Sequence, residues 1–255
     1  MPVRDNRVKQ ILAEGGVVYS SSVRLPAPGL CEILGYAGFD FVLIDGEHGS
    51  PDYSTIDQMV QSCWAGRTVP FYRVVRNDDE AVMMKVLDLG VQGILIPHCR
   101  SAADANFLKQ AALYPPAGRR GYGPGRGIMW GRIPTDEYFA GINQTVFLFG
   151  LVEDPDGVEN VDEIAAAGLD CLWVGTGDLA LGYGVSGQRQ HPKVMEAAGR
   201  ILAACKDHGI ACGFPAGTVE EAKWAVEQGF RIVGFGGAES FVMKAGRDCL
   251  ESVGR

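Results

Sequence analysis

The chain has 255 residues, of which 47% are hydrophobic, with a net charge of −8 and an isoelectric point near 5.0. This length is typical of one (β/α)8 barrel and is enough to bury one substantial core. The acidic balance argues against a nucleic-acid-binding protein, which normally has a basic face. No apolar run approaches the roughly 20 residues that span a bilayer, and the polar, helix-like start lacks the apolar core of a signal peptide. We therefore expect a cytoplasmic protein that binds neither nucleic acid nor a membrane.

Seven cysteines are spread singly along the chain, without a CxxC pair or any paired spacing. They are Cys31, Cys63, Cys99, Cys171, Cys205, Cys212 and Cys249. We expect free thiols that pack as small hydrophobic side chains in a reducing compartment.

Eight short apolar runs have the composition of strands that are buried on both faces. They are Val17–Ser21, Phe39–Asp45, Pro70–Val75, Gly93–His98, Val146–Glu153, Cys171–Gly175, Ala211–Pro215 and Ile232–Gly236. Segments with helical spacing of apolar residues lie between most of them. These are Ser54–Ala65, Asp79–Leu89, Ala102–Leu113, Val158–Ala167, Pro192–His208, Val219–Gln228 and Ser240–Glu251.

The predicted helices also have end signals. Asp78, Ser101 and Thr218 are candidate N-caps, and Glu221 lies three residues after Thr218, as in a capping box. A glycine follows several helices and should end them. These glycines are Gly38, Gly90, Gly168, Gly209 and Gly229.

The strict alternation of strands and helices predicts a parallel sheet. Eight such units in a chain of this length favour one closed (β/α)8 barrel, a TIM barrel spanning 1–255 as a single domain, over an open sheet. No dinucleotide-binding fingerprint follows the first strand, which also disfavours an open sheet. The longest irregular segment, Tyr114–Arg132, is rich in glycine and is a candidate lid.

Active-site residues of such barrels lie at the carboxyl ends of the strands. Polar side chains gather at these positions along the chain: Asp45, Glu47, His48, Arg73, His98, Arg100, Glu153 and Asp178. Strands seven and eight instead end in small, mostly apolar residues, FPAG and GFGG. The predicted active site therefore draws on strands two to six.

Glu153 and Asp178 end neighbouring strands, so both can reach one point above the barrel. Two carboxylates with open positions suit a hard cation such as Mg²⁺ or Mn²⁺. A 2-oxo acid can chelate such a cation, which then stabilises an enolate as a Lewis acid. The alternative is that both carboxylates cap helices at βα turns.

His48 follows Asp45 by three residues, and an Asp–His pair can form a general base. The alternative is a surface-loop histidine. Arg73 lies in an apolar strand, so it should meet an anion, either a substrate or an internal partner such as Asp45 or Asp88. The lysines all fall in helical segments, which disfavours a Schiff-base mechanism.

These motifs resemble the HpcH/HpaI aldolase family over nearly the whole chain, from about Gly29 onward. The similar segments are GFDFVLIDGEHGS, VLDLGVQGILIP, YPPAGRRGYG, LVED, VGTGDLALGYG and HPKVMEA. The order and spacing of the DGEH and GxxDL motifs are specific to the family.

The resemblance implies a barrel of the phosphoenolpyruvate/pyruvate type and a class II aldolase that forms pyruvate and an aldehyde from a 4-hydroxy-2-oxo acid. It implies a divalent cation, Mg²⁺ or Mn²⁺ or also Co²⁺, as cofactor. It further implies a homo-oligomer, a trimer of dimers, whose subunits exchange their last helix. The implied site residues are Glu153 and Asp178 as metal ligands; His48, Asp45 and Asp88 in proton transfer; Arg73 at the enolate oxygen; and the backbone N–H groups of Gly177 and Asp178 at the substrate carboxylate.

Some residues depart from the family pattern. Leu151 replaces a glutamine, and Gly175-Thr176-Gly177 replaces Gly-Pro-Ala. Two alternatives therefore stay open: a related lyase of the same superfamily, including an acyl-CoA lyase with Arg119, Arg120 and Arg126 at the CoA phosphates, and a non-catalytic barrel that binds a 2-oxo acid.

Overall fold

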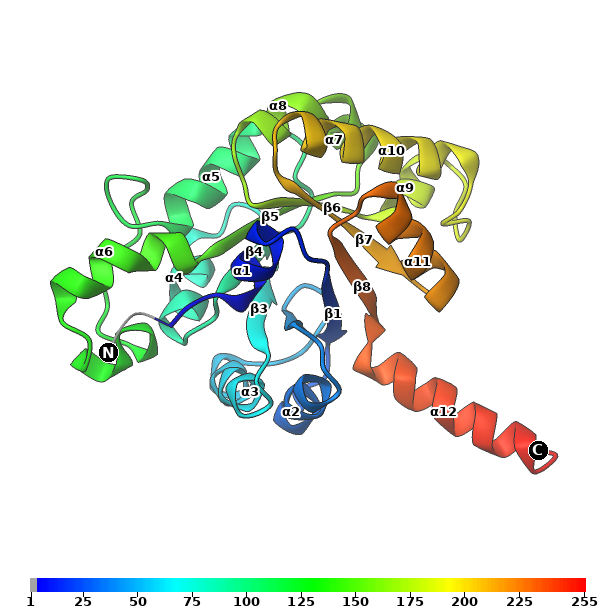
Figure 1. The fold of residues 1–255 in the computed structure, drawn as a ribbon, viewed down its shortest axis with the longest axis horizontal. Helices are drawn as coiled ribbons and strands as arrows, with labels where there is room; N and C mark the ends of the chain where they lie inside the picture. Colours follow the sequence, from blue (N-terminus) through cyan, green and yellow to red (C-terminus); the bar gives the residue numbers. More distant parts are fainter. Residues whose placement is uncertain (1–3) are drawn as a thin grey trace.

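A computed structural model describes residues 4–255 of the chain. Eight parallel strands close into a barrel in chain order, and the last strand pairs with the first (Figure 1). The strands are β1 (Val18–Val23), β2 (Phe41–Asp45), β3 (Val69–Arg73), β4 (Gly93–Ile96), β5 (Phe147–Val152), β6 (Cys171–Val174), β7 (Ala211–Ala216) and β8 (Ile232–Gly237). The predicted TIM-barrel fold and all eight strands are confirmed, with ends shifted by one or two residues.

Helices surround this barrel (Figure 1). The helices that match predicted segments are α3 (Tyr53–Ala65), α4 (Glu80–Asp88), α5 (Ala102–Ala112), α10 (Pro192–Asp207), α11 (Val219–Gln228) and α12 (Ala238–Ser252), together with α1 (Arg7–Ala13) in the polar start. The predicted helix Val158–Ala167 is two short helices, α7 (Pro155–Glu159) and α8 (Val161–Ala166). The elements that were not predicted are α2 (Pro28–Tyr36), the 3-10 helix η1 (Arg126–Gly131), α6 (Thr135–Thr145) and α9 (Thr176–Gly182).

The predicted end signals hold with two corrections. Asp79, not Asp78, caps α4, because its carboxylate accepts a hydrogen bond from the backbone N–H of Val82. Thr218 caps α11, but the Glu221 carboxylate accepts from the Gly217 N–H rather than closing a capping box on Thr218. The five glycines that should end helices all have positive φ, between 68° and 106°, which a residue without Cβ adopts most easily.

The side chains inside the barrel form layers, because alternate residues of a strand point to the same side. Tilted and edge-on phenyl rings fill the lower layer, including Phe41, Phe71 and Phe149. Two residues further along β2 and β5 come Leu43 and Leu151, and two residues further again come Asp45 and Glu153. The two-residue spacing therefore places the polar side chains at the carboxyl ends of the strands, above an apolar floor.

Trp173 of β6 completes this floor on the side of β7 and β8. A Cβ atom on Gly213 would lie 2.5 Å from the Trp173 ring, and one on Gly234 would lie 2.6 Å from it. The small residues of strands seven and eight thus make room for a large indole from the neighbouring strand.

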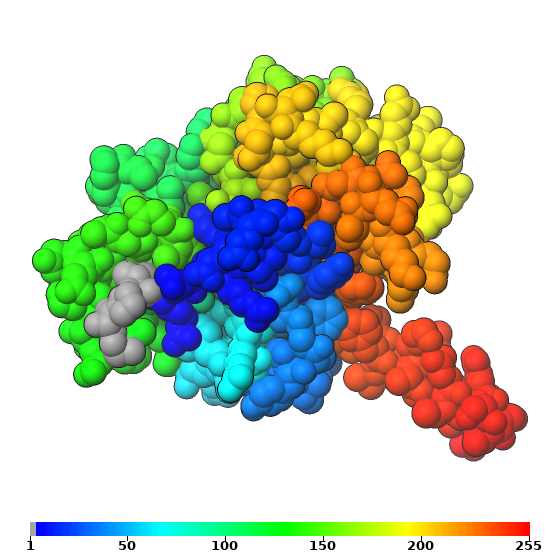
Figure 2. Space-filling view, viewed as in Figure 1, coloured from blue at the N-terminus to red at the C-terminus, as the bar shows by residue number. Residues whose placement is uncertain are grey.

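Helix α12 leaves the barrel and projects from it (Figures 1 and 2). Only Ala238 of this helix is buried, whereas Val242 is 64% exposed and Met243 is 56% exposed. Its first turn contacts the body of the protein through Phe241, which stacks on Phe39. None of the helices within residues 4–255 is long and apolar enough to cross a membrane.

Six of the seven cysteines are buried free thiols, as expected. Cys249, on α12, is free but exposed.

Candidate active site

A cavity of about 300 Å³, the mouth cavity, opens at the carboxyl ends of the strands. It gathers polar groups from β2, β3, β5 and the turn after β6 above the apolar floor. The predicted site residues that line it are Asp45, His48, Arg73, Glu153, Gly177 and Asp178. Of the residues that the family resemblance assigns to the site, Asp88 alone lies outside this lining.

Glu153 follows the last residue of β5 and is 3% exposed. Its Oε1 atom accepts a hydrogen bond from the backbone N–H of His98 at 2.8 Å. It does not cap a helix, because Asp154 is the N-cap residue of α7. Burial raises the pKa of the Glu153 carboxyl to about 7; the His98 N–H opposes this rise, and the nearby charges of Asp178 and Glu47 add to it.

Asp178 lies in the first turn of α9, three residues after the N-cap residue Gly175. No side chain caps this helix start, and the first-turn residues Thr176, Gly177 and Asp178 line the cavity. The effect of Asp178 on the pKa of Glu153 shows that the two carboxylates lie close enough to repel each other. Repulsion between the buried Glu153 and the exposed Asp178 would be relieved by a bound cation.

The donor set fits a hard cation with few protein ligands. Within residues 4–255, no three His, Cys, Asp or Glu side chains form a closed metal-binding group. Glu153 and Asp178 alone would leave positions for water and a chelating substrate, as Mg²⁺ sites often do.

Asp45, at the end of β2, holds Arg73, which ends β3 beside it. The Arg73 guanidinium donates two hydrogen bonds to this carboxylate, from Nε at 2.9 Å and from Nη2 at 2.6 Å. Burial alone would raise the pKa of Asp45, but the hydrogen bonds and charge of Arg73 hold it below its ordinary value. The internal partner foreseen for Arg73 is therefore Asp45, and the paired guanidinium still lines the cavity.

His48 lies in the loop after β2, with its side chain 64% exposed at the cavity. Asp45 accepts a hydrogen bond from the backbone N–H of His48 at 3.1 Å. The imidazole Nε2 atom instead lies 3.8 Å from Oε2 of Glu47. Asp45 thus fixes the loop that carries His48, whereas the sequence motif predicts that it orients the imidazole ring.

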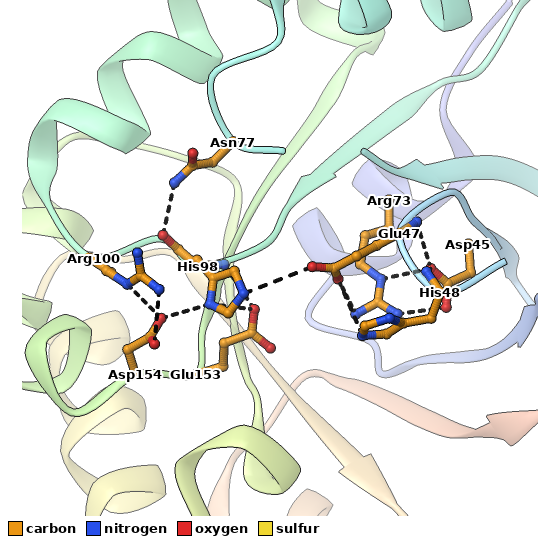
Figure 3. Close-up of polar contacts among 9 residues, drawn as sticks. All are labelled: Asp45, Glu47, His48, Arg73, Asn77, His98, Arg100, Glu153 and Asp154. Atoms are coloured by element: carbon orange, nitrogen blue, oxygen red, sulfur yellow. Dashed lines mark hydrogen bonds and ion pairs between the residues drawn. The ribbon is translucent and has the colours of Figure 1, made fainter. Parts of the chain in front are cut away.

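Glu47 links two parts of the site (Figure 3). One of its oxygens pairs with Arg73 Nη1 at 2.8 Å, and the other lies 3.9 Å from Nε2 of His98. The sequence alone assigns no role to Glu47 within the IDGEH run. Only the fold shows that Glu47 lies between Arg73 and His98.

The backbone N–H of His98 holds the Glu153 carboxylate. Its φ of 49° is unusual for a residue other than glycine, and this conformation accompanies the N–H bond to Glu153. Its Nδ1 atom lies 2.9 Å from Oδ2 of Asp154, which Arg100 also contacts at 2.9 Å. Burial lowers the pKa of His98, but Asp154 and Glu153 outweigh it and raise the pKa overall.

A family model, HpcH/HpaI aldolase/citrate lyase, matches residues 22–245. The chain belongs to this family. A 5-keto-4-deoxy-D-glucarate aldolase of Salmonella paratyphi A is 34% identical over 233 residues, 91% of this chain and 90% of that protein. An HpcH/HpaI aldolase/citrate lyase family protein of Burkholderia cenocepacia is 30% identical with a TM-score of 0.91, covering 97% and 99% of the two chains. An HpcH/HpaI aldolase of Desulfitobacterium hafniense is 27% identical with a TM-score of 0.92, covering 96% and 95%.

Membership of the HpcH/HpaI family makes the chain an enzyme of the lyase class, as the sequence motifs indicate. The neighbours named above share its closed barrel over nearly their full length. In this chain the DGEH motif lies at the end of β2 and the GxxDL motif follows β6.

Asp88, which the family resemblance assigns to proton transfer, ends α4. Its carboxylate accepts a hydrogen bond from Arg120 at 2.6 Å, and Arg120 is 4% exposed. Within a single copy of this HpcH/HpaI chain, Asp88 therefore belongs to the cluster around the loop 114–132. Among the described residues, neither Asp88 nor this candidate lid lines the mouth cavity.

The arginines that an acyl-CoA lyase could use also lie elsewhere. Arg119 pairs with Glu80 at 2.9 Å, and Arg126 pairs with Asp57 at 2.8 Å. Together with Arg120 they are absent from the cavity lining in the part of the chain that the structure describes. This arrangement disfavours the CoA alternative within the family.

Other cavity residues were not found from the sequence. Ser20 and Ser22 of β1, Trp173 and Arg189 all line the mouth. The alternation of β1 could have indicated the serines, because Val18, Ser20 and Ser22 share one face. Arg189 lies in an irregular loop, and no periodicity indicates which way it points.

Proposed function

We propose that this protein is a divalent-metal-dependent aldolase that cleaves the C3–C4 bond of a 4-hydroxy-2-oxo acid into pyruvate and an aldehyde, or joins them. One observation carries the proposal: a single cavity is lined by Glu153 and Asp178, which suit a cation, together with Arg73 and His48. The chemistry needs an anion-binding group, a proton carrier and a site for a cation within reach of one substrate, and this cavity brings them together.

The start of α9 is the proposed site for the substrate carboxylate. The backbone N–H groups of Gly177 and Asp178 belong to the first turn, where helix N–H groups lack internal partners. These groups and the helix dipole favour a carboxylate. A 2-oxo acid bound there has its carbonyl oxygen toward the centre of the cavity.

Arg73 is the proposed group at the 2-oxo oxygen. Bond cleavage leaves electrons on the pyruvate fragment, and the negative charge develops on this oxygen. A guanidinium held by Asp45 and Glu47 is already oriented, so it stabilises the charge without reorganising. Asp45 is a positioning residue in this scheme.

His48 is the proposed proton carrier. In the cleavage direction it accepts the proton of the C4 hydroxyl, the C3–C4 bond breaks, and the C4–O bond becomes the aldehyde carbonyl. The electron pair of the broken bond passes into the pyruvate enolate, and a proton returned to C3 completes pyruvate. The exposed position of His48 at the cavity lets it exchange protons with solvent.

Glu153 and Asp178 would hold the cation, Mg²⁺, Mn²⁺ or Co²⁺. When bound, it would supply Lewis-acid stabilisation of the developing negative charge. The raised pKa of Glu153 supports this assignment, because a buried carboxylate beside another acid is stabilised in its charged form by a cation.

The relatives that are named 5-keto-4-deoxy-D-glucarate aldolase support a sugar-derived 2-oxo acid as the natural substrate class.

The aldolase proposal is tested by proton exchange at C3 of pyruvate in ²H₂O, followed by NMR with each metal and after chelation. We expect metal-dependent exchange that His48→Ala slows strongly. Background exchange with pyruvate still bound would instead favour a non-catalytic 2-oxo-acid-binding barrel.

We also propose a homo-oligomer, a trimer of dimers, in which α12 is exchanged between subunits. Exposed apolar side chains on a helix that projects from the barrel support this, because large apolar surfaces are normally covered by a partner.

A further inference from the structure

Three arginines line the mouth cavity, and two of them are held by carboxylates. Arg73 pairs with Asp45, and Arg24 lies 3.6 Å from the same carboxylate. The side chain of Arg189 has neither an ion pair nor a hydrogen bond within residues 4–255. A cation of this kind at the edge of an active-site cavity is available for a ligand.

The position of Arg189 is next to the start of α9. Its Nη2 and Nε atoms lie 3.6 Å and 3.9 Å from where a Cβ atom on Gly177 would be. The guanidinium therefore lies beside the residue whose N–H is proposed to bind the substrate carboxylate.

The loop that carries Arg189 is held in place. The neighbouring Gln190 donates a short hydrogen bond to Glu221 on α11, and the same carboxylate accepts from the Gly217 N–H at 2.6 Å. His191 caps α10 directly after it. Because Gln190 and His191 are anchored, the backbone at Arg189 loses less conformational entropy when the side chain binds a ligand.

A second cavity of about 440 Å³ adjoins the mouth at this point. Arg189, Thr176, Pro215 and Gly217 line both cavities, so Arg189 lies at their boundary. A substrate whose reacting carbons lie over Arg73 and Glu153 can extend past Arg189 toward this second space.

We propose that Arg189 is a specificity-determining residue that binds a second carboxylate of the substrate, the one carried by the aldehyde fragment. This inference rests on the proposed function and narrows its substrate class to dianionic 2-oxo acids. The first carboxylate already has the α9 N–H groups, whereas a carboxylate at the far end of the chain requires a cation of its own. An arginine suits it, because its planar fork donates two parallel hydrogen bonds to a carboxylate.

The first test measures binding by calorimetry, with Mg²⁺ present, for two ligands of equal chain length. These are 2-oxoadipate, which has the far carboxylate, and 2-oxohexanoate, which lacks it. We expect the wild type to prefer 2-oxoadipate by about tenfold or more, as a charge-assisted hydrogen bond implies. Arg189→Ala should abolish that preference, and Arg189→Lys should restore part of it.

The matched control is Lys193→Ala, which removes one positive charge from the start of α10 without altering either cavity lining. It should keep the wild-type preference, which separates direct contact from a general change in charge. An equal loss of preference in both variants would overturn the proposal, and so would equal binding of the two ligands by the wild type.

The second test measures aldol addition of pyruvate to 4-oxobutanoate and to butanal. Arg189→Ala should raise the KM for 4-oxobutanoate at least tenfold more than that for butanal, while kcat changes less. An equal rise for both aldehydes, or a larger rise in the KM for pyruvate, would overturn the assignment to the aldehyde side. Wild-type C3 exchange of pyruvate is measured alongside: its absence would count against the aldolase proposal, and the calorimetric comparison would still decide the role of Arg189.

Discussion

Glu153 and Gly175 lie so close that no other residue fits at position 175 without moving the carboxylate. A Cβ atom on Gly175 would overlap Cβ of Glu153 and would lie 3.1 Å from its Oε2 atom. Gly175 ends up there because its N–H pairs with the carbonyl of Val152, just before Glu153, as β5 and β6 run side by side. The GTGDL motif therefore supplies one proposed metal ligand, Asp178, and the space for the other.

Gly175→Ala should displace Glu153 and weaken the binding of Mn²⁺ by at least tenfold, because the overlap falls on atoms close to the backbone that have no freedom to yield. Titration of Mn²⁺ by electron paramagnetic resonance measures this. Gly199→Ala in α10 is the matched control, because a Cβ atom there meets nothing within 4 Å. It should bind Mn²⁺ normally and be equally or more stable, by up to about 1 kcal/mol. Unchanged Mn²⁺ binding in Gly175→Ala would contradict the proposed role of Glu153.

Glu153→Gln should abolish metal-dependent turnover and yet stabilise the metal-free protein at pH 8. The pKa of Glu153 is raised from an ordinary 4.5 to about 7, so its contribution to folding is complete below pH 4.5 and is lost as the pH rises through 7. By linkage, the variant should gain about 2–3 kcal/mol over the wild type above pH 7 and nothing below pH 4.5.

Urea unfolding at several pH values, with chelator present, measures this difference. Saturating Mg²⁺ should then raise the stability of the wild type only, because the variant lacks the second carboxylate. A variant that is less stable at pH 8 without metal would show that favourable contacts of the charged Glu153 outweigh the cost of its burial.

Asp45→Asn should destabilise the protein by about 2–4 kcal/mol at neutral pH, because it leaves a largely buried Arg73 with Glu47 as its remaining anion. The pKa of Asp45 lies below its ordinary value of 3.8, so its stabilising contribution is present above that pH and is lost as the pH falls further. The stability difference between variant and wild type should therefore shrink only in strong acid.

A role in positioning Arg73 should also change kinetics. The Asp45→Asn variant should lower kcat for aldol cleavage more than it raises KM for the 2-oxo acid, since the guanidinium is proposed to act mainly on the charge that develops during cleavage. The control is Asp57→Asn, which breaks the partly buried ion pair between Asp57 and Arg126 away from the mouth cavity. Equal kinetic losses in both variants would remove the case for Asp45.

The barrel itself could be predicted because its signals are repeated and local. Each strand is a continuous apolar run, and a glycine with positive φ ends the preceding helix at five of the predicted positions. The sequence pattern does not predict helix α2, although Pro28 in its first turn is a start signal, because the short helix follows an irregular segment. The short helices α7 and α8 could not be separated from one helix, since the break at Asn160 leaves the apolar spacing intact.

The site was predictable only in part. Residues at the end of a strand or directly after it, such as Asp45, Arg73 and Glu153, are located by the alternation of the strand itself. Arg189 and the backbone of His98 are not, because loop geometry and tertiary contacts decide where they point. The partner of Asp88 likewise depended on how the loop 114–132 folds back on α4.

Helix α12 gives the last prediction, which concerns assembly. Val242 and Met243 are more than half exposed on a helix whose only buried residue is Ala238, so the barrel of the same chain does not cover them. Val242→Asp should therefore weaken assembly, because it introduces a charge into the apolar surface that a second subunit is proposed to bury.

Light scattering coupled to size-exclusion chromatography measures the mass directly. The wild type should elute as an oligomer larger than a dimer, and Val242→Asp should shift it toward smaller species. Glu251→Ala, on the same helix but polar and exposed, is the control and should leave the mass unchanged. If Val242→Asp keeps the wild-type mass, α12 is not exchanged between subunits.

The same preparations test whether a second subunit completes the site, because Asp88 lies outside the mouth cavity of its own chain. If it does, C3 exchange of pyruvate should fall when the oligomer dissociates.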